Sequence, residues 1–318
     1  MKNMKKLLCM LLALAMVLAL CACGSSTEEA ATEEAPAEEA AATEAPAEDA
    51  AAEEEVDYSA MTIDELKPLI TTVTEGKLTV ATSPDFAPYE FYAIGEDGTP
   101  QLAGFDMSLA AYIADYLGLE LEVIPVDFDG VLNELAAGNV DLGMAGLSPD
   151  PTRMDAMDFS DIYYQGGQSF VTVQDKVDLF PDLESANNPE YSIGAQNGSI
   201  QLDLANEYTP DADIVPLVKV TDIVAELLSD KLDGAFIETA VAENYAITNP
   251  DLAVILDVPY DVEGSSIGVV KGNEALLAGV NLAIAAAIAD GSMDTFVAEA
   301  NELSTGEIIE GLLDDQAA

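Results

Sequence analysis

The chain has 318 residues and a formal net charge of −50, with 60 acidic and 10 basic side chains and no histidine. A surface this acidic repels nucleic acid and anionic lipid headgroups, so neither is expected as a partner. The length is sufficient for two domains or one large one. All three cysteines precede residue 24, which leaves the rest of the chain without a disulfide, a thiolate nucleophile or a Cys or His metal ligand.

Residues 1–22 are interpreted as an export signal peptide. Lysines near the start are followed by the apolar run 7–20 and then by small residues, which is typical of a cleaved signal. A membrane anchor helix is the alternative, although the run is short for a membrane span. Residues 20–24 resemble a bacterial lipoprotein cleavage box with Cys23 as the lipidated first residue. The mature protein is then expected to be held outside the cell membrane by lipid chains.

Residues 23–58 are predicted to form a disordered, acidic tether. They consist mainly of Ala, Glu, Thr and Pro. Such a segment cannot bury enough apolar surface to offset the entropy that ordering would cost, and its like charges repel one another. The folded part of the chain is therefore expected to begin at about residue 59.

The first elements after the tether end near several aromatic residues. Residues 62–74 are predicted to form a helix with Thr62 as its N-cap and Glu65 completing a capping box. Residues 78–81 follow as a buried strand that leads into a proline-rich loop. Phe86 and Tyr89 in this loop either line a ligand site or pack in a small core.

Helices and strands then alternate up to residue 146. Helices are predicted at 105–117, where apolar residues recur at spacings of three and four, and at 128–137; strands are predicted at 121–126 and 140–146. This alternation favours a parallel sheet covered by helices. Since ligands bind beyond the carboxyl ends of such strands, the loops at 83–86 and 145–148 are expected to lie on one edge.

The second half of the chain repeats this rhythm after an extended run at 168–173. Strands are predicted at 191–196, 214–218, 234–237 and 253–256, and helices at 200–208, 221–229 and 239–248. Residues 266–271 are expected to cross back to the first part. Helices at 274–289 and 292–303 complete the chain. The first of these is apolar on all sides, but a buried core helix is favoured over a membrane span because it is short and contains Asn281.

Two charged residues stand out as candidates for ligand binding. Arg153 is the only arginine, and its planar fork of donors can grip a carboxylate with two parallel hydrogen bonds, which lysine cannot do. A solvated surface charge is the alternative. Glu238 follows the apolar strand 234–237, where a buried acid is costly without a cationic partner. A free amino acid has one negative and one positive end, so this pair could hold it.

Several segments resemble the family 3 extracellular solute-binding proteins, the amino-acid receptors of ABC importers. The resemblance covers residues 77–303 in order, and Ser108 departs from it because the family usually has an acid there. The segments that carry it are 104–114, 127–130, 139–141, 148–153, 158–161, 197–199, 232–235 and 267–272.

This resemblance implies an α/β fold of two lobes joined by two crossing hinge strands, with the first lobe discontinuous. Residues 59–168 and 266–318 would form the first lobe and residues 169–265 the second. The implied protein is a monomer without a cofactor, a metal or catalytic residues. It would capture a free amino acid and deliver it to a cognate ABC permease.

The resemblance also implies a ligand site between the lobes. Arg153 and Ser148 would bind the ligand carboxylate with backbone N–H groups near Ile200, and Glu238 would receive the ammonium group. Aspartate is commoner than glutamate at position 238, so the ligand range is open. The full set of implied ligand-binding residues is Ser83, Phe86, Phe128, Ala145, Gly146, Ser148, Arg153, Gln196, Asn197, Ser199, Ile200 and Glu238.

The class of amino acid is predicted from the loop that begins at Ser83. Family members for cationic ligands tend to have an acid there, so a neutral polar ligand is favoured, although Asp85 and Glu90 lie nearby and leave a cationic ligand as the alternative. A dehydratase-type enzyme on the same fold is another alternative, disfavoured because no His, Cys or isolated acid pair offers chemistry. An adhesin or sensor, and calcium binding at 211–213, are weaker alternatives.

Overall fold

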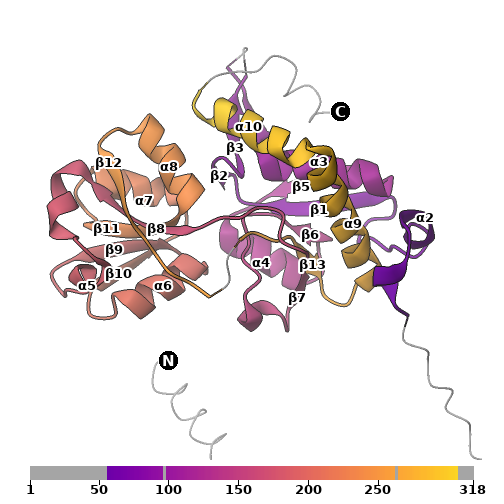
Figure 1. Cartoon of the computed structure of the whole chain (residues 1–318), viewed down its shortest axis with the longest axis horizontal. Helices are drawn as coiled ribbons and strands as arrows, with labels where there is room; N and C mark the ends of the chain where they lie inside the picture. The colour runs from indigo at the N-terminus through magenta and orange to yellow at the C-terminus, as the bar shows by residue number, and fades with distance from the viewer. Residues whose placement is uncertain (1–55, 96–97, 262–263, 307–318) are drawn as a thin grey trace, which may run out of the picture. The chain divides into compact units, whose positions relative to one another are not determined.

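The computed structural model describes residues 56–95, 98–261 and 264–306 (Figure 1). The predicted signal peptide, the predicted lipidation site Cys23 and the predicted tether up to residue 55 lie outside the described residues. A short 3₁₀ helix, η1 (Tyr58–Ala60), opens the described part.

The first lobe contains a five-stranded sheet in the order β5-β1-β6-β13-β7. Strand β1 pairs in parallel with β5 and β6, whereas β13 runs antiparallel to both β6 and β7. Strand β13 comes from the late part of the chain, so two distant segments build this sheet. The bounds are β1 (Lys77–Thr82), β5 (Glu120–Pro125), β6 (Leu142–Gly143), β7 (Met157–Phe159) and β13 (Gly268–Val270).

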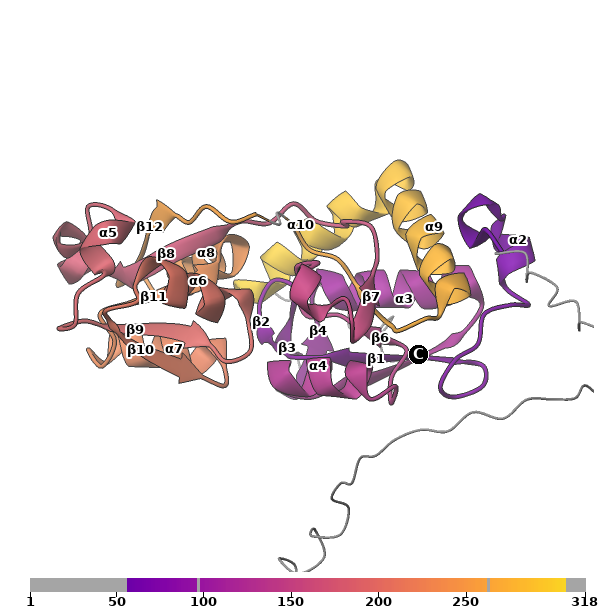
Figure 2. The ribbon, with the colours of Figure 1, turned by 90° about the horizontal axis from the view of Figure 1, so that it is seen from below.

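Helices cover both faces of the first sheet, as Figures 1 and 2 show. Helices α3 (Phe105–Leu117), α9 (Glu274–Asp290) and α10 (Ser292–Ser304) lie on one face, and α4 (Phe128–Ala136) lies on the other. The apolar stripe predicted for α3 is buried against β1 and α9, and Gly118 ends α3 in the left-handed conformation (φ 77°). The helices predicted at 105–117, 128–137, 274–289 and 292–303 are confirmed.

One helix prediction in this lobe is wrong. The segment 62–74 is helical only in α2 (Ile63–Leu66), although the backbone N–H of Thr62 donates to the carboxylate of Glu65 as the capping box requires (2.9 Å). Lys67 still has helical backbone angles, but Pro68 has no N–H to continue the helical hydrogen-bond ladder, which explains the early end.

A second sheet of three short strands was not predicted. Strands β2 (Asp85–Phe86), β3 (Glu90–Ile94) and β4 (Pro100–Ala103) form an antiparallel sheet, so the segment predicted as a loop at 83–86 is partly a strand. Gly104 (φ 124°) lies so close to this sheet that a Cβ atom there would be 2.1 Å from the carbonyl oxygen of Tyr89. Only glycine permits this packing of α3 against β3.

The second lobe is built around another five-stranded sheet, in the order β10-β9-β11-β8-β12. Helices α5 (Leu183–Ala186) and α6 (Ile200–Tyr208) cover one face, and α7 (Val220–Leu228) and α8 (Thr239–Thr248) cover the other (Figure 1). Side chains along β11 alternate between these two layers, as the pleat of a strand requires. The strands are β8 (Gln168–Val173), β9 (Ser192–Gln196), β10 (Asp213–Leu217), β11 (Gly234–Glu238) and β12 (Leu252–Asp257).

Two chain segments connect the lobes. One precedes β8 and the other follows β12, and they meet in an antiparallel bridge between Tyr164 and Ser265. The backbone N–H of Tyr163 also donates to the carbonyl of Ser265 (2.9 Å). The exact lobe boundaries at 168/169 and 265/266 stay predictions.

Helix α9 is continuous through Asn281, whose side-chain oxygen accepts a hydrogen bond from the backbone N–H of Asp161 (2.9 Å). The helix predicted at 274–289 is therefore confirmed, with Asn281 inside it. Within the described residues no single helix is long and apolar enough to cross a membrane; α9 and α10 pass that test only as a pair bent by 79°.

Candidate functional site

The predicted ligand-binding residues lie at or beyond the carboxyl ends of five strands. Strands β1, β5 and β6 lead into the first-lobe residues, and β9 and β11 lead into or contain the second-lobe residues. This is the edge at which parallel sheets place their ligands. Hydrogen bonds from Arg153 to Gly198 and from Asn197 to Asp129 join the lobes, so the two edges face each other.

Arg153 lies at the junction of the two lobes. It ends the 3₁₀ helix η2 (Pro151–Arg153), and its Nη2 donates to the carbonyl oxygen of Gly198 in the second lobe (3.0 Å). Its Cζ is 5.9 Å from the ring centroid of Phe128. Burial lowers the pKa of Arg153, while Asp150 and Asp203 act in the opposite direction. The guanidinium is therefore partly desolvated and held against an aromatic face rather than free on the surface.

Glu238 is almost completely buried, with 3% of its surface exposed. It ends β11 and caps α8, where its carboxylate accepts hydrogen bonds from the backbone N–H groups of Val241 (2.9 Å) and Gly167 (3.4 Å) and from the hydroxyl of Tyr89 (3.2 Å). Burial raises the pKa of Glu238 to about 7, although these hydrogen bonds favour the ionised form. A cation beside this carboxylate would lower the pKa again.

An aromatic wall runs from the first lobe towards Glu238. The rings of Phe86 and Tyr89 have centroids 5.4 Å apart, and Tyr89 donates to Glu238. Gly146 (φ 58°) packs directly on Phe86, because a Cβ there would be 2.7 Å from the ring. A side chain at position 146 would therefore displace the aromatic wall.

The remaining first-lobe residues are buried near this wall. Ser83 directs its hydroxyl to Asp85 (2.8 Å). Phe128 opens α4 and is 7% exposed. Ala145 belongs to the apolar cluster beneath α4, and Ser148 is 5% exposed in the loop that leads to Arg153.

The second-lobe residues cluster at the start of α6. Ser199 is the N-cap and accepts a hydrogen bond from the backbone N–H of Leu202 (3.3 Å), and Ile200 is the first helical residue. Gln196 is buried at the end of β9. The side-chain amide of Asn197 donates to Asp129 of the first lobe. The N-terminus of a helix offers backbone N–H groups and a partial positive charge to an anion.

Sequence reasoning missed a buried polar network below Gly146. The carboxylate of Asp106 accepts hydrogen bonds from the hydroxyl of Tyr163 (2.7 Å) and the backbone N–H of Gly146 (3.3 Å). Burial raises the pKa of Asp106 to about 6, and burial together with Asp106 raises the pKa of Glu90 well above its usual range. A signal existed, since Asp106 lies in a segment that carried the family resemblance.

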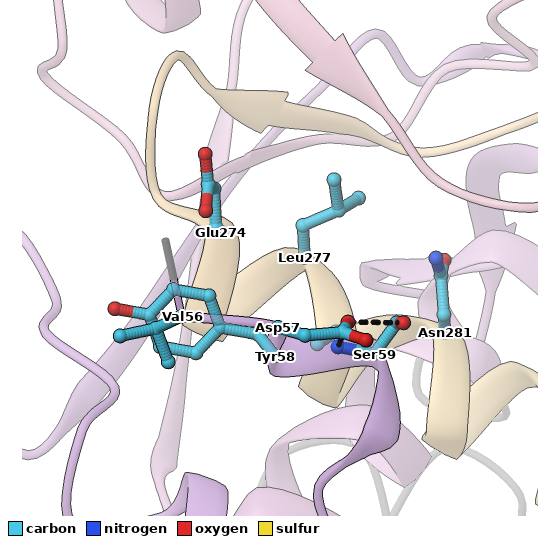
Figure 3. A pocket seen from close by; sticks show the side chains of 8 residues that line it. Val56, Asp57, Tyr58, Ser59, Glu274, Leu277 and Asn281 are labelled. Atoms are coloured by element: carbon cyan, nitrogen blue, oxygen red, sulfur yellow. Dashed lines mark hydrogen bonds between the residues drawn. The ribbon is translucent and has the colours of Figure 1, made fainter. Parts of the chain in front are cut away.

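Two other observations concern alternative sites. Among the residues that the structure describes, no group of three or more acidic, His or Cys side chains could hold a metal ion. A hollow of about 250 Å³ lies between the segment around Tyr58 and helix α9, lined by Glu274, Leu277 and Asn281 among others (Figure 3). None of the predicted ligand-binding residues lines this hollow.

The fold of two α/β lobes and the facing charged residues define a protein of the bacterial solute-binding class. The family model of bacterial extracellular solute-binding proteins, family 3, matches residues 78–299. The chain belongs to this family, whose two-lobed, discontinuous fold agrees with the fold predicted from the sequence.

Individual relatives differ in their named activities. The chain is 35% identical over 203 residues to the arginine-binding extracellular protein ArtP of Bacillus subtilis (strain 168), covering 62% of this chain and 76% of ArtP. It resembles the crystal structure of AbpA, an amino acid ABC transporter substrate-binding protein from Streptococcus pneumoniae Canada MDR_19A bound to L-arginine, with a TM-score of 0.70 and 30% identity, covering 73% of this chain and 98% of AbpA.

A relative with a different activity is cyclohexadienyl dehydratase of Pseudomonas aeruginosa. It is 27% identical over 187 residues, which is 58% of this chain and 68% of the enzyme.

Proposed function

We propose that this protein captures a free amino acid between its two lobes and delivers it to an ABC permease at the cell membrane. The observation that carries this proposal is the pair of Arg153 and Glu238, one from each lobe, both desolvated at the edge where the strands of the two sheets end. The protein acts as a lipid-anchored monomer through Cys23 and is not an enzyme.

Arg153 grips the ligand carboxylate. Its side chain is oriented by Phe128 and by the carbonyl of Gly198, beside the N-terminus of α6. The hydroxyl of Ser148 and the first N–H groups of α6 complete the anion site. A guanidinium is well suited because it donates two parallel hydrogen bonds to a carboxylate.

Glu238 receives the ligand ammonium group. Burial raises its pKa to about 7, and an ammonium group beside this carboxylate favours the ionised form. A ligand that contacts both lobes favours the closed arrangement because it binds that arrangement better than the open one.

The ligand side chain lies between Phe86 and Phe128, and a neutral polar side chain fits best. Position 83 carries a serine, and the nearby carboxylate of Asp85 already accepts hydrogen bonds from Ser83, Gln196 and the backbone of Val220. A carboxylate engaged in this way is less available to a cationic ligand.

A cationic amino acid is the second candidate. It is favoured by the names of the relatives, since ArtP is called arginine-binding and AbpA was crystallised with L-arginine. One relative is named as a dehydratase. This chain, however, contains no histidine, and it contains no cysteine after residue 23.

A thermal-shift screen of the twenty amino acids tests the proposal. A ligand at one hundred times its Kd adds about 2.7 kcal/mol to the stability of the folded state. We expect L-glutamine or another neutral polar amino acid to give the largest shift, and L-arginine to do so if the second candidate is right.

Arg153→Lys should remove the shift while the unliganded melting temperature stays unchanged. An amino acid that stabilises Arg153→Lys as strongly as the parent protein would contradict the proposed role of Arg153. The absence of a shift with all twenty would contradict amino-acid binding itself.

A further inference from the structure

Asp85 is the residue through which the first lobe is most extensively hydrogen-bonded to the second. Its Oδ2 accepts hydrogen bonds from the backbone N–H of Val220 (2.6 Å) and from Nε2 of Gln196 (3.4 Å), and its backbone carbonyl accepts one from the hydroxyl of Tyr245 (3.0 Å). These three donors belong to three different elements of the second lobe. Within its own lobe, Ser83 donates to Oδ1 (2.8 Å).

The shortest of these contacts is at the N-terminus of helix α7. The N-cap residue of α7 is Lys219, whose side chain makes no capping hydrogen bond, and Val220 is the first helical residue. The first N–H groups of a helix need an acceptor, and a carboxylate near them also interacts favourably with the helix dipole. Lys219 cannot accept a hydrogen bond through its side chain, and Asp85 of the other lobe supplies the missing acceptor.

The contact is buried rather than superficial. Asp85 is only 9% exposed, and both Val220 and Gln196 are almost completely buried. Buried hydrogen bonds to a charged acceptor are stronger than neutral ones and are costly to break without replacement. Opening the lobes would break all three bonds from the second lobe to Asp85.

We propose that Asp85 is a positioning residue that caps helix α7 across the cleft and stabilises the closed lobes in the absence of ligand. Asp85 thereby sets the fraction of molecules that are already closed, and through that fraction it sets affinity for every ligand to the same extent. The cap does not depend on the proposed function, whereas its effect on affinity does.

Distance measurements on the ligand-free protein test the cap directly. Spin labels are placed at two exposed positions, Asp155 in the first lobe and Glu207 on α6, in the full chain with its three native cysteines replaced by serine. Asp85→Ala should shift the inter-lobe distance distribution to longer distances than in the parent protein. An unchanged distribution in a folded Asp85→Ala variant overturns the proposal.

Two further variants separate the cap from effects of charge and folding. Asp222→Asn removes an exposed acid from the first turn of the same helix and should leave the distance distribution unchanged; the same opening as in Asp85→Ala would overturn the proposal. Val220→Pro removes the capped N–H itself, and proline is tolerated at the first helical position. It should open the lobes as Asp85→Ala does, and a closed distribution in this variant would also overturn the proposal.

Binding of L-glutamine and L-arginine then distinguishes a cap from a ligand contact. The cap predicts that Asp85→Ala raises the apparent Kd of whichever of these amino acids bind the parent protein by the same factor, about tenfold. A loss confined to L-arginine would overturn the proposal, because it would make Asp85 a direct partner of the ligand cation. If neither amino acid binds the parent protein, the proposed function is in question, while the ligand-free distances still decide on the cap.

Discussion

Buried carboxylates govern the site at the scale of single residues. Burial raises the pKa of Asp85, Glu90, Asp106 and Glu238, in a chain whose net charge is already −50. Burying a carboxylate disfavours its ionised form, so each of these groups costs stability where it is forced to ionise. Glu238 differs from the other three because it lies beside the proposed ligand site. Its ionised carboxylate can therefore pair with the ammonium group of the ligand.

Glu238→Gln should stabilise the unliganded protein at pH 8 but hardly at pH 4.5. The folded-state pKa of Glu238 is raised to about 7 from an ordinary value of 4.5. The contribution of Glu238 to the stability of the folded state is therefore fully present below about pH 4.5 and is lost as the pH rises through about 7. The expected gain at pH 8 is about 1–3 kcal/mol. Urea unfolding at both pH values measures the difference in free energy of unfolding between the variant and the parent protein. An equal difference at pH 4.5 and pH 8 would contradict the argument that burial raises the pKa of Glu238.

Amino-acid affinity should fall as the pH drops below about 7. The ligand ammonium pairs with the ionised form of Glu238, which becomes scarce below its pKa of about 7. The apparent Kd should rise roughly tenfold for each pH unit well below that value, and binding should release a proton. Calorimetry in two buffers with different ionisation enthalpies detects the release. A pH-independent Kd between 5 and 8 would count against a carboxylate partner.

At the scale of elements, a single acid ties strand β1 to the segment that follows α2. Asp141, fully buried just before β6, accepts hydrogen bonds from the backbone N–H groups of Val73 and Thr79 (both 2.8 Å) and from the hydroxyl of Thr79 (2.6 Å). Strand β6 pairs with β1 only at Val80–Leu142 and Ala81–Gly143, so the hydrogen bonds of this carboxylate add to a short ladder. The Asp141 carboxylate therefore stabilises strands β1 and β6, whose carboxyl ends lead into the ligand-binding residues.

Asp141→Ala should destabilise the fold by about 3 kcal/mol, because it leaves buried N–H groups without an acceptor. Asp115→Ala, which removes an exposed acid from α3, is the control and should change stability by less than about 0.5 kcal/mol. Chemical denaturation compares the two. Similar stabilities of both variants would show that the three hydrogen bonds contribute little.

At the scale of the whole molecule, the excess of acids should make stability depend on salt. Like charges on a compact chain repel one another, and salt screens them over a Debye length of about 10 Å at 0.1 M. The melting temperature should therefore rise by several degrees between 10 mM and 500 mM NaCl, at about 2–4 °C per kcal/mol gained. A melting temperature that stays level or falls over this range would show that self-repulsion is minor.

The sequence predicted most elements because their signals are local. Helix α3 could be read from apolar residues spaced three and four apart and from Gly118 at its end. Helix α2 is shorter than its predicted range because Pro68 has no N–H to continue the hydrogen-bond ladder. The sheet β2-β3-β4 was missed because a two-residue strand has no periodicity, and its pairing depends on Gly104 allowing α3 to approach.

Single residues of the site could be named from the sequence, but not their contacts. The charge types of Arg153 and Glu238 and their places after strands indicated a zwitterion site, since strand ends gather at one edge of a parallel sheet. Their desolvation, the aromatic face under Arg153 and the capping of α7 by Asp85 depend on residues distant in sequence. Only the tertiary structure decides such contacts, because residues from two lobes meet at one edge only after both sheets have folded and β13 has returned to the first.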